Sequence, residues 1–185
     1  MPAEIFVFFG MIATGKSTLA EGFARSRNIA GFNSDRVRKE LAGLTPQTRR
    51  PDGVGQGIYA ADFSRRTYDA LLDAAAREIA ADRAVVLDAS YGARAERDRV
   101  RALGRRLGVR VRFVHCVCPE AEMKRRMEER AQDDRAVSDG RWEIYLAQKQ
   151  SFEPPAEIEA ADLVTLSTDA PPAVLQQRLA QQLAT

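Results

Sequence analysis

The segment GMIATGKS at residues 10–17 constrains the fold of this chain more than any other. It fits the pattern G-x-x-x-x-G-K-[S/T], it directly follows the apolar run EIFVFF at 4–9, and a stretch with helical spacing begins near Lys16. A strand, a glycine-rich turn and a helix in this order surround an anion with backbone N–H groups and the positive end of the helix. The sequence therefore predicts a phosphate-binding loop for a nucleotide.

Individual side chains of this loop have specific expected roles. Lys16 is expected to reach the β- and γ-phosphates of ATP, and the Ser17 hydroxyl to ligate Mg²⁺, with Thr18 beside it. The glycines permit the tight backbone of the loop. The predicted nucleotide-binding residues are Gly10, Met11, Ile12, Ala13, Thr14, Gly15, Lys16, Ser17 and Thr18.

The rest of the chain alternates between short apolar runs and stretches with helical spacing. Further strands are predicted at 29–33, 84–87, 109–117 and 163–166. Helices are predicted at 34–41, 59–81, 93–107, 119–131, 138–152 and 171–183, and a long functional or mobile loop at 43–57. This alternation predicts a three-layer α/β fold with a five-stranded parallel sheet, in which ligands bind at the carboxyl ends of the strands.

Length and composition limit the class of protein further. The 185 residues, of which 45% are hydrophobic, fit a single domain over 1–185. The apolar runs are too short to span a bilayer and no signal segment is recognisable, so we expect a cytoplasmic protein without a membrane partner. Cys116 and Cys118 are interpreted as strand residues, and His115 is the only histidine, so neither a disulfide framework nor a zinc site is expected.

Lysine is scarce among the cations of this chain. Of the 28 Lys and Arg residues, only four are Lys, and the net charge is +2. We interpret the abundant arginines as solvated side chains rather than as a nucleic-acid-binding surface. A lysine that stands in a known motif, as Lys16 does in the phosphate-loop pattern, therefore indicates a functional role more strongly than an arginine would.

Carboxylates follow the second and third predicted strands. Asp35 comes after Ser34, one helical turn before Arg38, and suits a general base that accepts the proton of a substrate hydroxyl. The alternative is that Asp35 or Ser34 only caps the helix.

Asp88 ends the third strand, where it either holds Mg²⁺ through water, orients Arg38, or only caps the strand end. Ser90 and Tyr91 follow it and could line an acceptor pocket. No Asp-Glu pair follows this strand, which favours transfer to a bound acceptor over transfer to water.

Arginines gather after the fourth predicted strand. Arg126 and Arg130 are four residues apart and share a helix face. A small lid at about 122–140 that carries them would stabilise the charge of a transferring phosphoryl group. The alternative is an ordinary solvated helix in which nearby glutamates pair with the arginines.

With these motifs in place, the sequence resembles the P-loop kinases of the polynucleotide kinase and zeta-toxin type, and most of all the AAA_33 group of small ATP-binding proteins. The resemblance rests on GMIATGKST, NSDRVRKELAG at 33–43, VVLDAS at 85–90 and the Arg126/Arg130 stretch. It implies a nucleoside-kinase-like P-loop NTPase fold with a small helical lid, ATP and Mg²⁺ as cofactors, Asp35 as general base, Arg38 as a substrate contact, and Arg126 and Arg130 in the lid.

The resulting hypothesis is an ATP- and Mg²⁺-dependent kinase that transfers the γ-phosphate to a hydroxyl of a small-molecule or nucleotide-like acceptor. Its predicted catalytic residues are Lys16, Asp35, Arg38, Arg126 and Arg130, and its predicted metal ligands are Ser17 and Asp88. One alternative is an ATP-binding regulatory module whose 43–57 loop orders on nucleotide binding and presents a surface to a partner. A kinase of 5′-hydroxyl nucleic-acid ends is another. The sequence identifies no protein partner.

Overall fold

The computed structural model describes residues 2–46, 48, 55–131 and 142–184. Its centre is a five-stranded parallel sheet with strand order β2-β3-β1-β4-β5. The strands are β1 (Ile5–Phe9), β2 (Ala30–Asn33), β3 (Val85–Asp88), β4 (Val111–Val117) and β5 (Leu163–Ser167). The α-helices are α1 (Lys16–Arg27), α2 (Ser34–Leu41), α3 (Ala61–Ala80), α4 (Arg94–Leu107), α5 (Glu120–Ala131), α6 (Trp142–Ser151) and α7 (Pro172–Leu183). The predicted α/β fold is confirmed.

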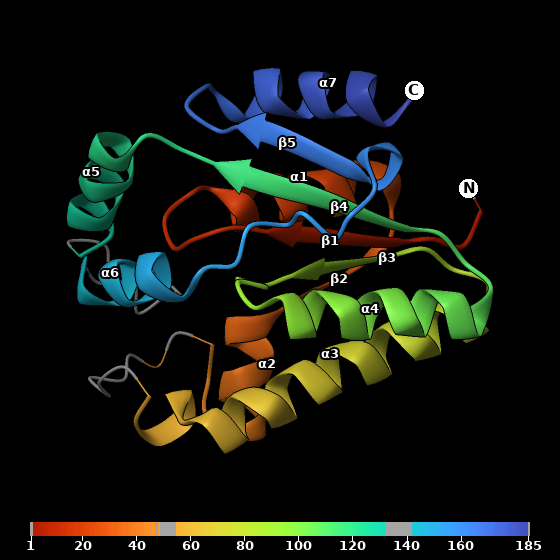
Figure 1. Ribbon diagram of the computed structural model, residues 1–185, viewed down its shortest axis with the longest axis horizontal. Helices are drawn as coiled ribbons and strands as arrows, with labels where there is room; N and C mark the ends of the chain where they lie inside the picture. Colours follow the sequence, from red (N-terminus) through yellow and green to blue (C-terminus); the bar gives the residue numbers. More distant parts are fainter. Residues whose placement is uncertain (1, 47, 49–54, 132–141, 185) are drawn as a thin grey trace.

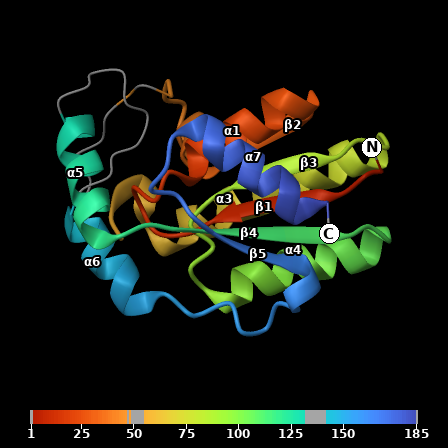
Figure 2. The same ribbon diagram turned by 90° about the horizontal axis from the view of Figure 1, so that it is seen from above.

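Helices cover both faces of the sheet, with α1 and α7 on one face and α3 and α4 on the other (Figures 1 and 2). The central strand β1 is therefore buried at every position. Phe6 and Phe8 point to the α1 face and pack with Phe23 of α1, at ring-centroid distances of 4.8 and 5.3 Å. Val7 and Phe9 point to the α3 face. The alternation of a strand thus supplies two separate apolar cores from one run.

The register of the sheet brings several strand ends together. Asp88 of β3 lies opposite both Phe8 of β1 and Asn33 of β2. The loop that follows β1 therefore begins beside the last residues of β2 and β3. Both α5 and α6 also lie at this end of the sheet, whereas the labelled chain ends lie at the opposite end (Figure 1).

The element boundaries differ from the prediction at a few places. A short 3₁₀ helix, η1 (Gly57–Tyr59), and an extended residue, Ala60, precede α3, whereas the sequence predicts one helix from Tyr59. A second 3₁₀ helix, η2 (Ala160–Asp162), precedes β5. The predicted start of the sixth helix at Ser138 lies outside the described residues, as does much of the 43–57 loop.

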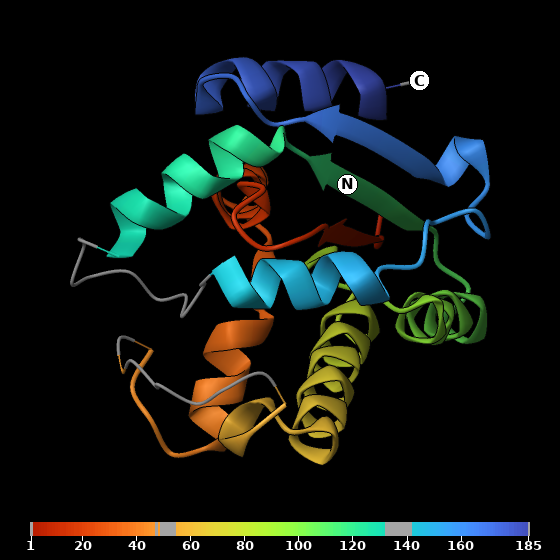
Figure 3. The same ribbon diagram turned by 60° about the vertical axis from the view of Figure 1, so that its left-hand side comes forward.

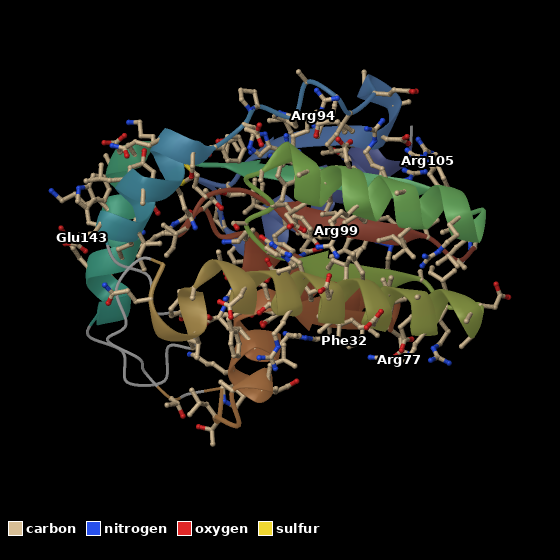
Figure 4. The ribbon with its side chains drawn as sticks, turned by 60° about the horizontal axis from the view of Figure 1, so that its bottom comes forward. Phe32, Arg77, Arg94, Arg99, Arg105 and Glu143 are labelled. Carbon is tan, nitrogen blue, oxygen red and sulfur yellow. The ribbon has the colours of Figure 1, made fainter. Side chains whose placement is uncertain are left out.

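Arg94, Arg99 and Arg101 of α4 are at least partly exposed and pair with acidic neighbours, which agrees with their interpretation as solvated side chains. Arg94 pairs with Asp98 at 3.3 Å. Arg99 lies between α4 and α3, where it pairs with Asp69 and with Glu96 (Figure 4). Such exposed pairs contribute little to stability, typically less than about 1 kcal/mol each.

Arg97 is the exception on α4, because its side chain is fully buried. Its guanidinium donates to the carbonyl oxygens of Tyr91 (2.9 Å) and Gly92 (3.2 Å) in the loop after β3. It also donates to the Glu157 carboxylate (2.5 and 3.2 Å) and to the Pro154 carbonyl (3.3 Å) in the segment after α6. Arg97 thus joins two loops that are far apart in the sequence.

Of the two cysteines, Cys116 lies in a strand as predicted, whereas Cys118 does not. Cys116 is buried in β4, and burial raises the pKa of its thiol to about 12. Cys118 lies just beyond the strand and is also a free thiol. Across the described ranges, none of the helices combines the length and the apolar character that crossing a bilayer requires.

His115 in β4 lies between two aromatic rings. Its imidazole stacks on Phe9 at 4.6 Å and on Phe152 at 5.5 Å between ring centroids. Burial, together with the nearby charge of Arg97, lowers the pKa of His115 to about 4. The imidazole is therefore neutral in the folded protein at neutral pH.

We expect this histidine to make the protein less stable in mild acid. An unfolded histidine titrates near pH 6.5, so between pH 6.5 and 4 the unfolded chain binds a proton that the folded chain does not. Stability is then lost as the pH falls through this window. Relative to His115→Phe, which keeps the ring stack without titrating, the wild type should lose about 2 kcal/mol between pH 7 and 4.5, allowing for partial exposure to solvent. Urea unfolding at both pH values measures this difference, and parallel losses in the two proteins would contradict it.

Candidate nucleotide-binding and transfer site

The loop between β1 and α1 has the backbone that its glycines predict. Gly10 has a φ of 142°, and a Cβ at this position would overlap the carbonyl oxygen of Cys116 in β4. Gly15 has a φ of 81° and forms the N-cap of α1. Ala13 also has a positive φ, of 61°, although it carries a side chain. Local strain of this kind persists only where the surrounding structure enforces it, and it is frequent at ligand sites.

Side chains within and around the loop hold this backbone in place. The Thr14 hydroxyl donates to the Met11 carbonyl at 2.8 Å, and the Lys16 ammonium lies 3.4 Å from the same oxygen. From outside the loop, buried Thr168 donates its hydroxyl to the Thr14 carbonyl. The Lys16 side chain therefore folds back over the loop. The sequence predicts that phosphates bind to the backbone N–H groups of this same loop.

Asn33, which the sequence analysis did not select, connects the loop to the strand ends. Its amide nitrogen lies 2.6 Å from Asp88 Oδ2 and 3.4 Å from the Ser17 hydroxyl. Its amide oxygen accepts from the backbone N–H groups of Asp35 (3.0 Å) and Arg36 (3.1 Å). Asn33 is thus the N-cap of α2, and the alternative in which Ser34 or Asp35 caps this helix is wrong.

Asp88 ends β3 with a buried carboxylate beside Asn33. Its side chain is 3% exposed, and its Oδ1 is buried without a hydrogen-bond partner in the described part of the chain. Its other oxygen, Oδ2, accepts from the Asn33 amide nitrogen at 2.6 Å. A buried carboxylate oxygen of this kind calls for a bound cation or water.

Asp35 lies in the first turn of α2, next to this strand end. Its carboxylate accepts from the Tyr59 hydroxyl at 3.2 Å and pairs with the Lys39 ammonium at 3.5 Å. The side chain is 20% exposed, and its Oδ2 is buried. The predicted base is therefore held by groups from two elements, α2 and η1.

Arg38 fastens α2 to the segment before α3. One of its terminal nitrogens donates to the Ile58 carbonyl at 2.6 Å and to the Ser64 hydroxyl at 3.1 Å, and its guanidinium lies 5.1 Å from the centre of the Tyr59 ring. Burial lowers the pKa of this guanidinium. This contact to η1 is a role that the sequence analysis did not predict.

The two residues after Asp88 and Ala89 have different positions. The Ser90 hydroxyl lies 3.1 Å from the Tyr68 hydroxyl, near the strand end. Tyr91 is 1% exposed and packs in the core between the sheet and α3 and α4. Burial raises the pKa of Tyr91 well above its usual value. The expectation that Tyr91 lines an acceptor pocket is therefore wrong, because the ring is part of the core.

Arg126 contacts the phosphate loop directly. Its guanidinium donates to the carbonyls of Ala13 (3.4 Å) and Thr168 (2.6 Å), and it pairs with Glu122 at 2.8 Å. The pair with Glu122 is the one that the alternative of a solvated helix predicts, whereas the contacts to the two carbonyls were not predicted from the sequence. The side chain of Arg130 and the lid residues 132–140 lie outside the described part.

Both α5 and α6 pack against the phosphate loop through a third apolar cluster, beside the strand ends (Figure 3). We call it the α5–α6 cluster, and its buried members are Ile12, Ala13, Met123, Met127 and Tyr145. The Gln148 side chain of α6 also accepts from the Ile12 backbone N–H at 2.8 Å. The two helices therefore contact the loop through both apolar and polar groups.

Comparison with known proteins agrees with this geometry. The family described as AAA domain, AAA_33, matches residues 5–155. A sugar kinase from Janibacter sp. HTCC2649 is 19% identical with a TM-score of 0.68, and the match covers 100% of this chain and 95% of that one. A gluconokinase from Sinorhizobium meliloti 1021 is 20% identical with a TM-score of 0.66 over 99% and 92% of the two chains.

An APS kinase from Mycobacterium tuberculosis, solved with AMPPNP and APS, is 19% identical with a TM-score of 0.63 over 100% and 99%. A search of curated proteins finds no match. Given the phosphate loop, the strand order and the family match, the chain is a member of the AAA domain family AAA_33 and has the fold of the P-loop kinases.

Proposed function

We propose that this protein is an ATP- and Mg²⁺-dependent kinase that phosphorylates a hydroxyl of a small-molecule or nucleotide-like acceptor. Lys16 and the loop backbone bind the donor phosphates, Asp35 accepts the proton of the acceptor hydroxyl, and Arg38 orients the acceptor. Arg126 and Arg130 stabilise the charge of the transferred group, as part of a lid over the site.

The observation that carries this proposal is the meeting of Ser17, Asn33, Asp88 and Asp35 at one edge of the sheet. Asn33 contacts the loop hydroxyl and the Asp88 carboxylate with one nitrogen, and its oxygen fixes the helix turn that bears Asp35. A donor site and a proton acceptor are thus joined through a single side chain. Phosphoryl transfer requires this proximity, because catalysis of this reaction consists mainly of positioning and charge stabilisation.

The residues present fit a magnesium ion. Ser17 offers a hydroxyl at the start of α1, and Asp88 offers the buried oxygen that has no hydrogen-bond partner among the described residues. Oxygen ligands of this kind, together with water and phosphate, are what Mg²⁺ prefers. A bound ion would neutralise charge on the donor phosphates. Asp35 and Arg38 would align the acceptor, and Asp35 would receive its proton.

Replacing Asp88 with Asn should raise the Mg²⁺ concentration for half-maximal transfer at least about 10-fold. The amide keeps an oxygen that can accept from Asn33, but it removes the negative charge that attracts the cation. The thermal stability of the metal-free protein should be unchanged or higher, because a buried charge is lost. Titration of activity and of ATP-dependent thermal shift with Mg²⁺ measures the effect. An unchanged Mg²⁺ requirement would remove Asp88 from the metal site.

The similar structures favour a small acceptor. Three of them are, by their titles, a sugar kinase, a gluconokinase and an APS kinase. Their titles name different activities although each of them shares this chain's fold, because function resides in the site rather than in the fold. The acceptor class for this chain is therefore a matter for direct assay.

Transfer of the γ-phosphate from labelled ATP tests the proposal. The acceptor panel contains sugars, sugar acids, nucleosides, nucleotides, aminoglycosides and 5′-hydroxyl oligonucleotides, with hydrolysis to water as the blank. Transfer to one class above the blank, dependent on Mg²⁺, is the expected result. ATP binding without transfer to any class would contradict the kinase assignment, and transfer to oligonucleotides alone would replace the small acceptor with a nucleic-acid end.

A further inference from the structure

Lys39, one of only four lysines, lies in the last turn of α2 with its side chain fully buried. A lysine ammonium is almost never fully buried unless polar or charged groups surround it, because loss of hydration is costly. Its nitrogen lies 3.5 Å from Asp35 Oδ2 and donates to the Pro46 carbonyl at 3.1 Å. The buried charge therefore faces the predicted base and the chain that follows α2.

The Asp35 carboxylate is held from two sides. Lys39 faces one of its oxygens from the same helix, four residues on, and the Tyr59 hydroxyl from η1 donates to the other oxygen at 3.2 Å. Arg38, on the adjoining turn of α2, adds a second positive charge near Asp35 and ties η1 to the helix. These contacts limit the rotation of the carboxylate.

We propose that Lys39 is a positioning residue for phosphoryl transfer. Its buried ammonium keeps the Asp35 carboxylate charged and aimed toward the acceptor, and it anchors the start of the 43–57 loop beside the site through Pro46. This inference rests on the proposed function, in which Asp35 is the base. Lys39 acts through Asp35 and touches neither substrate nor nucleotide.

Removal of the Lys39 charge should change the pH at which Asp35 is protonated, which a purely structural role of Lys39 would not do. A positive charge within about 4–6 Å favours the ionised carboxylate by one to three pH units. Lys39→Met and Lys39→Gln should therefore move the protonation of Asp35 upward by about one to three pH units, whereas Lys39→Arg should stay near the wild type. Lys39→Gln keeps a donor for the Pro46 carbonyl and so separates the charge from the hydrogen bond.

The first measurement is a ¹³C NMR titration of aspartate carboxyl groups in the wild type and the three Lys39 variants. Comparison with Asp35→Asn assigns the Asp35 signal, and no acceptor is needed. An upward shift of the Asp35 midpoint in both uncharged variants supports the inference. An unchanged midpoint in a folded uncharged variant overturns it. If neither uncharged variant folds, the double variant Lys39→Met with Asp35→Asn should fold, because it removes both members of the buried pair. Failure of the double variant as well would overturn the inference in favour of a packing role.

The second measurement uses the acceptor found by the transfer assay. In Lys39→Met the acidic limb of the kcat/KM profile should move upward with the NMR midpoint, kcat at pH 7 should fall about 10-fold, and the KM for ATP should stay constant. In the Asp35→Asn background, Lys39→Met should cause no further loss. A wild type that transfers to no acceptor refutes the proposed function, whereas transfer that depends on Asp35 but not on Lys39 refutes only this inference.

Discussion

Replacing Asp35 with Asn is expected to lower kcat for phosphoryl transfer at least about 100-fold, which is the usual loss when a general base is removed. The Asn side chain has nearly the same shape, and its oxygen can still accept from Tyr59, so the helix turn should keep its structure. The carboxylate lies next to the donor site but outside the phosphate loop. The Kd for ATP should therefore change little, and a loss in kcat alone would show that Asp35 acts in the transfer step.

Single-turnover transfer to the identified acceptor and calorimetric ATP binding measure these two quantities. Arg36→Gln is the matched control, because Arg36 lies on the same helix but makes an exposed ion pair with Glu21 at 3.0 Å. This control should keep both kcat and the Kd for ATP. Equal turnover in Asp35→Asn and the wild type would remove Asp35 from the mechanism.

Replacing Arg97 with Met is expected to lower the free energy of unfolding by about 3–5 kcal/mol, which is typical when one partner of a buried ion pair is removed. The variant leaves the Glu157 carboxylate, which is 4% exposed, without its cation. The carbonyls of Tyr91 and Gly92 also lose a donor. Urea unfolding measures the change.

Arg99→Met is the matched control on the same helix, because Arg99 makes pairs that are partly exposed to solvent. It should cost less than about 1 kcal/mol. Adding Glu157→Gln to Arg97→Met should recover part of the stability, since the unpaired buried charge is then gone. An Arg97→Met variant no less stable than Arg99→Met would contradict the role of Arg97 as the link between two loops.

The sequence was sufficient to predict the phosphate loop, the parallel sheet and the edge at which the candidate residues gather. These features have local signals: a glycine and lysine pattern, apolar runs, and carboxylates at strand ends. Asn33 has no such signal, because its bridge between Ser17 and Asp88 depends on the register of neighbouring strands. Tyr91 likewise follows a strand end as a ligand residue would, and only packing places its ring in the core.

For two buried cations, the spacing along the helix gives a recognisable signal in the sequence. Arg97 precedes Val100, Leu103 and Gly104 at helical spacing, so it lies on the inward face of α4. Among 24 arginines of which most are solvated, this position was not distinguished. Lys39 is four residues after Asp35, and this spacing on a helix predicts contact. A charged residue on the apolar face of a helix thus indicates that it is buried with a partner. Which residue is the partner is known only from the folded structure.

The α5–α6 cluster has a consequence for the order in which the protein opens. Its members contact the phosphate loop but belong to neither of the two cores that flank the sheet. A small cluster of this kind supports a separate cooperative unit, which unfolds locally at a lower free energy than the sheet. Backbone amides of α5 and α6 should therefore exchange with solvent before those of β1 and β4. Since Ile12 and Ala13 are shared between this cluster and the loop, a ligand that rigidifies the loop would slow the exchange of both helices together.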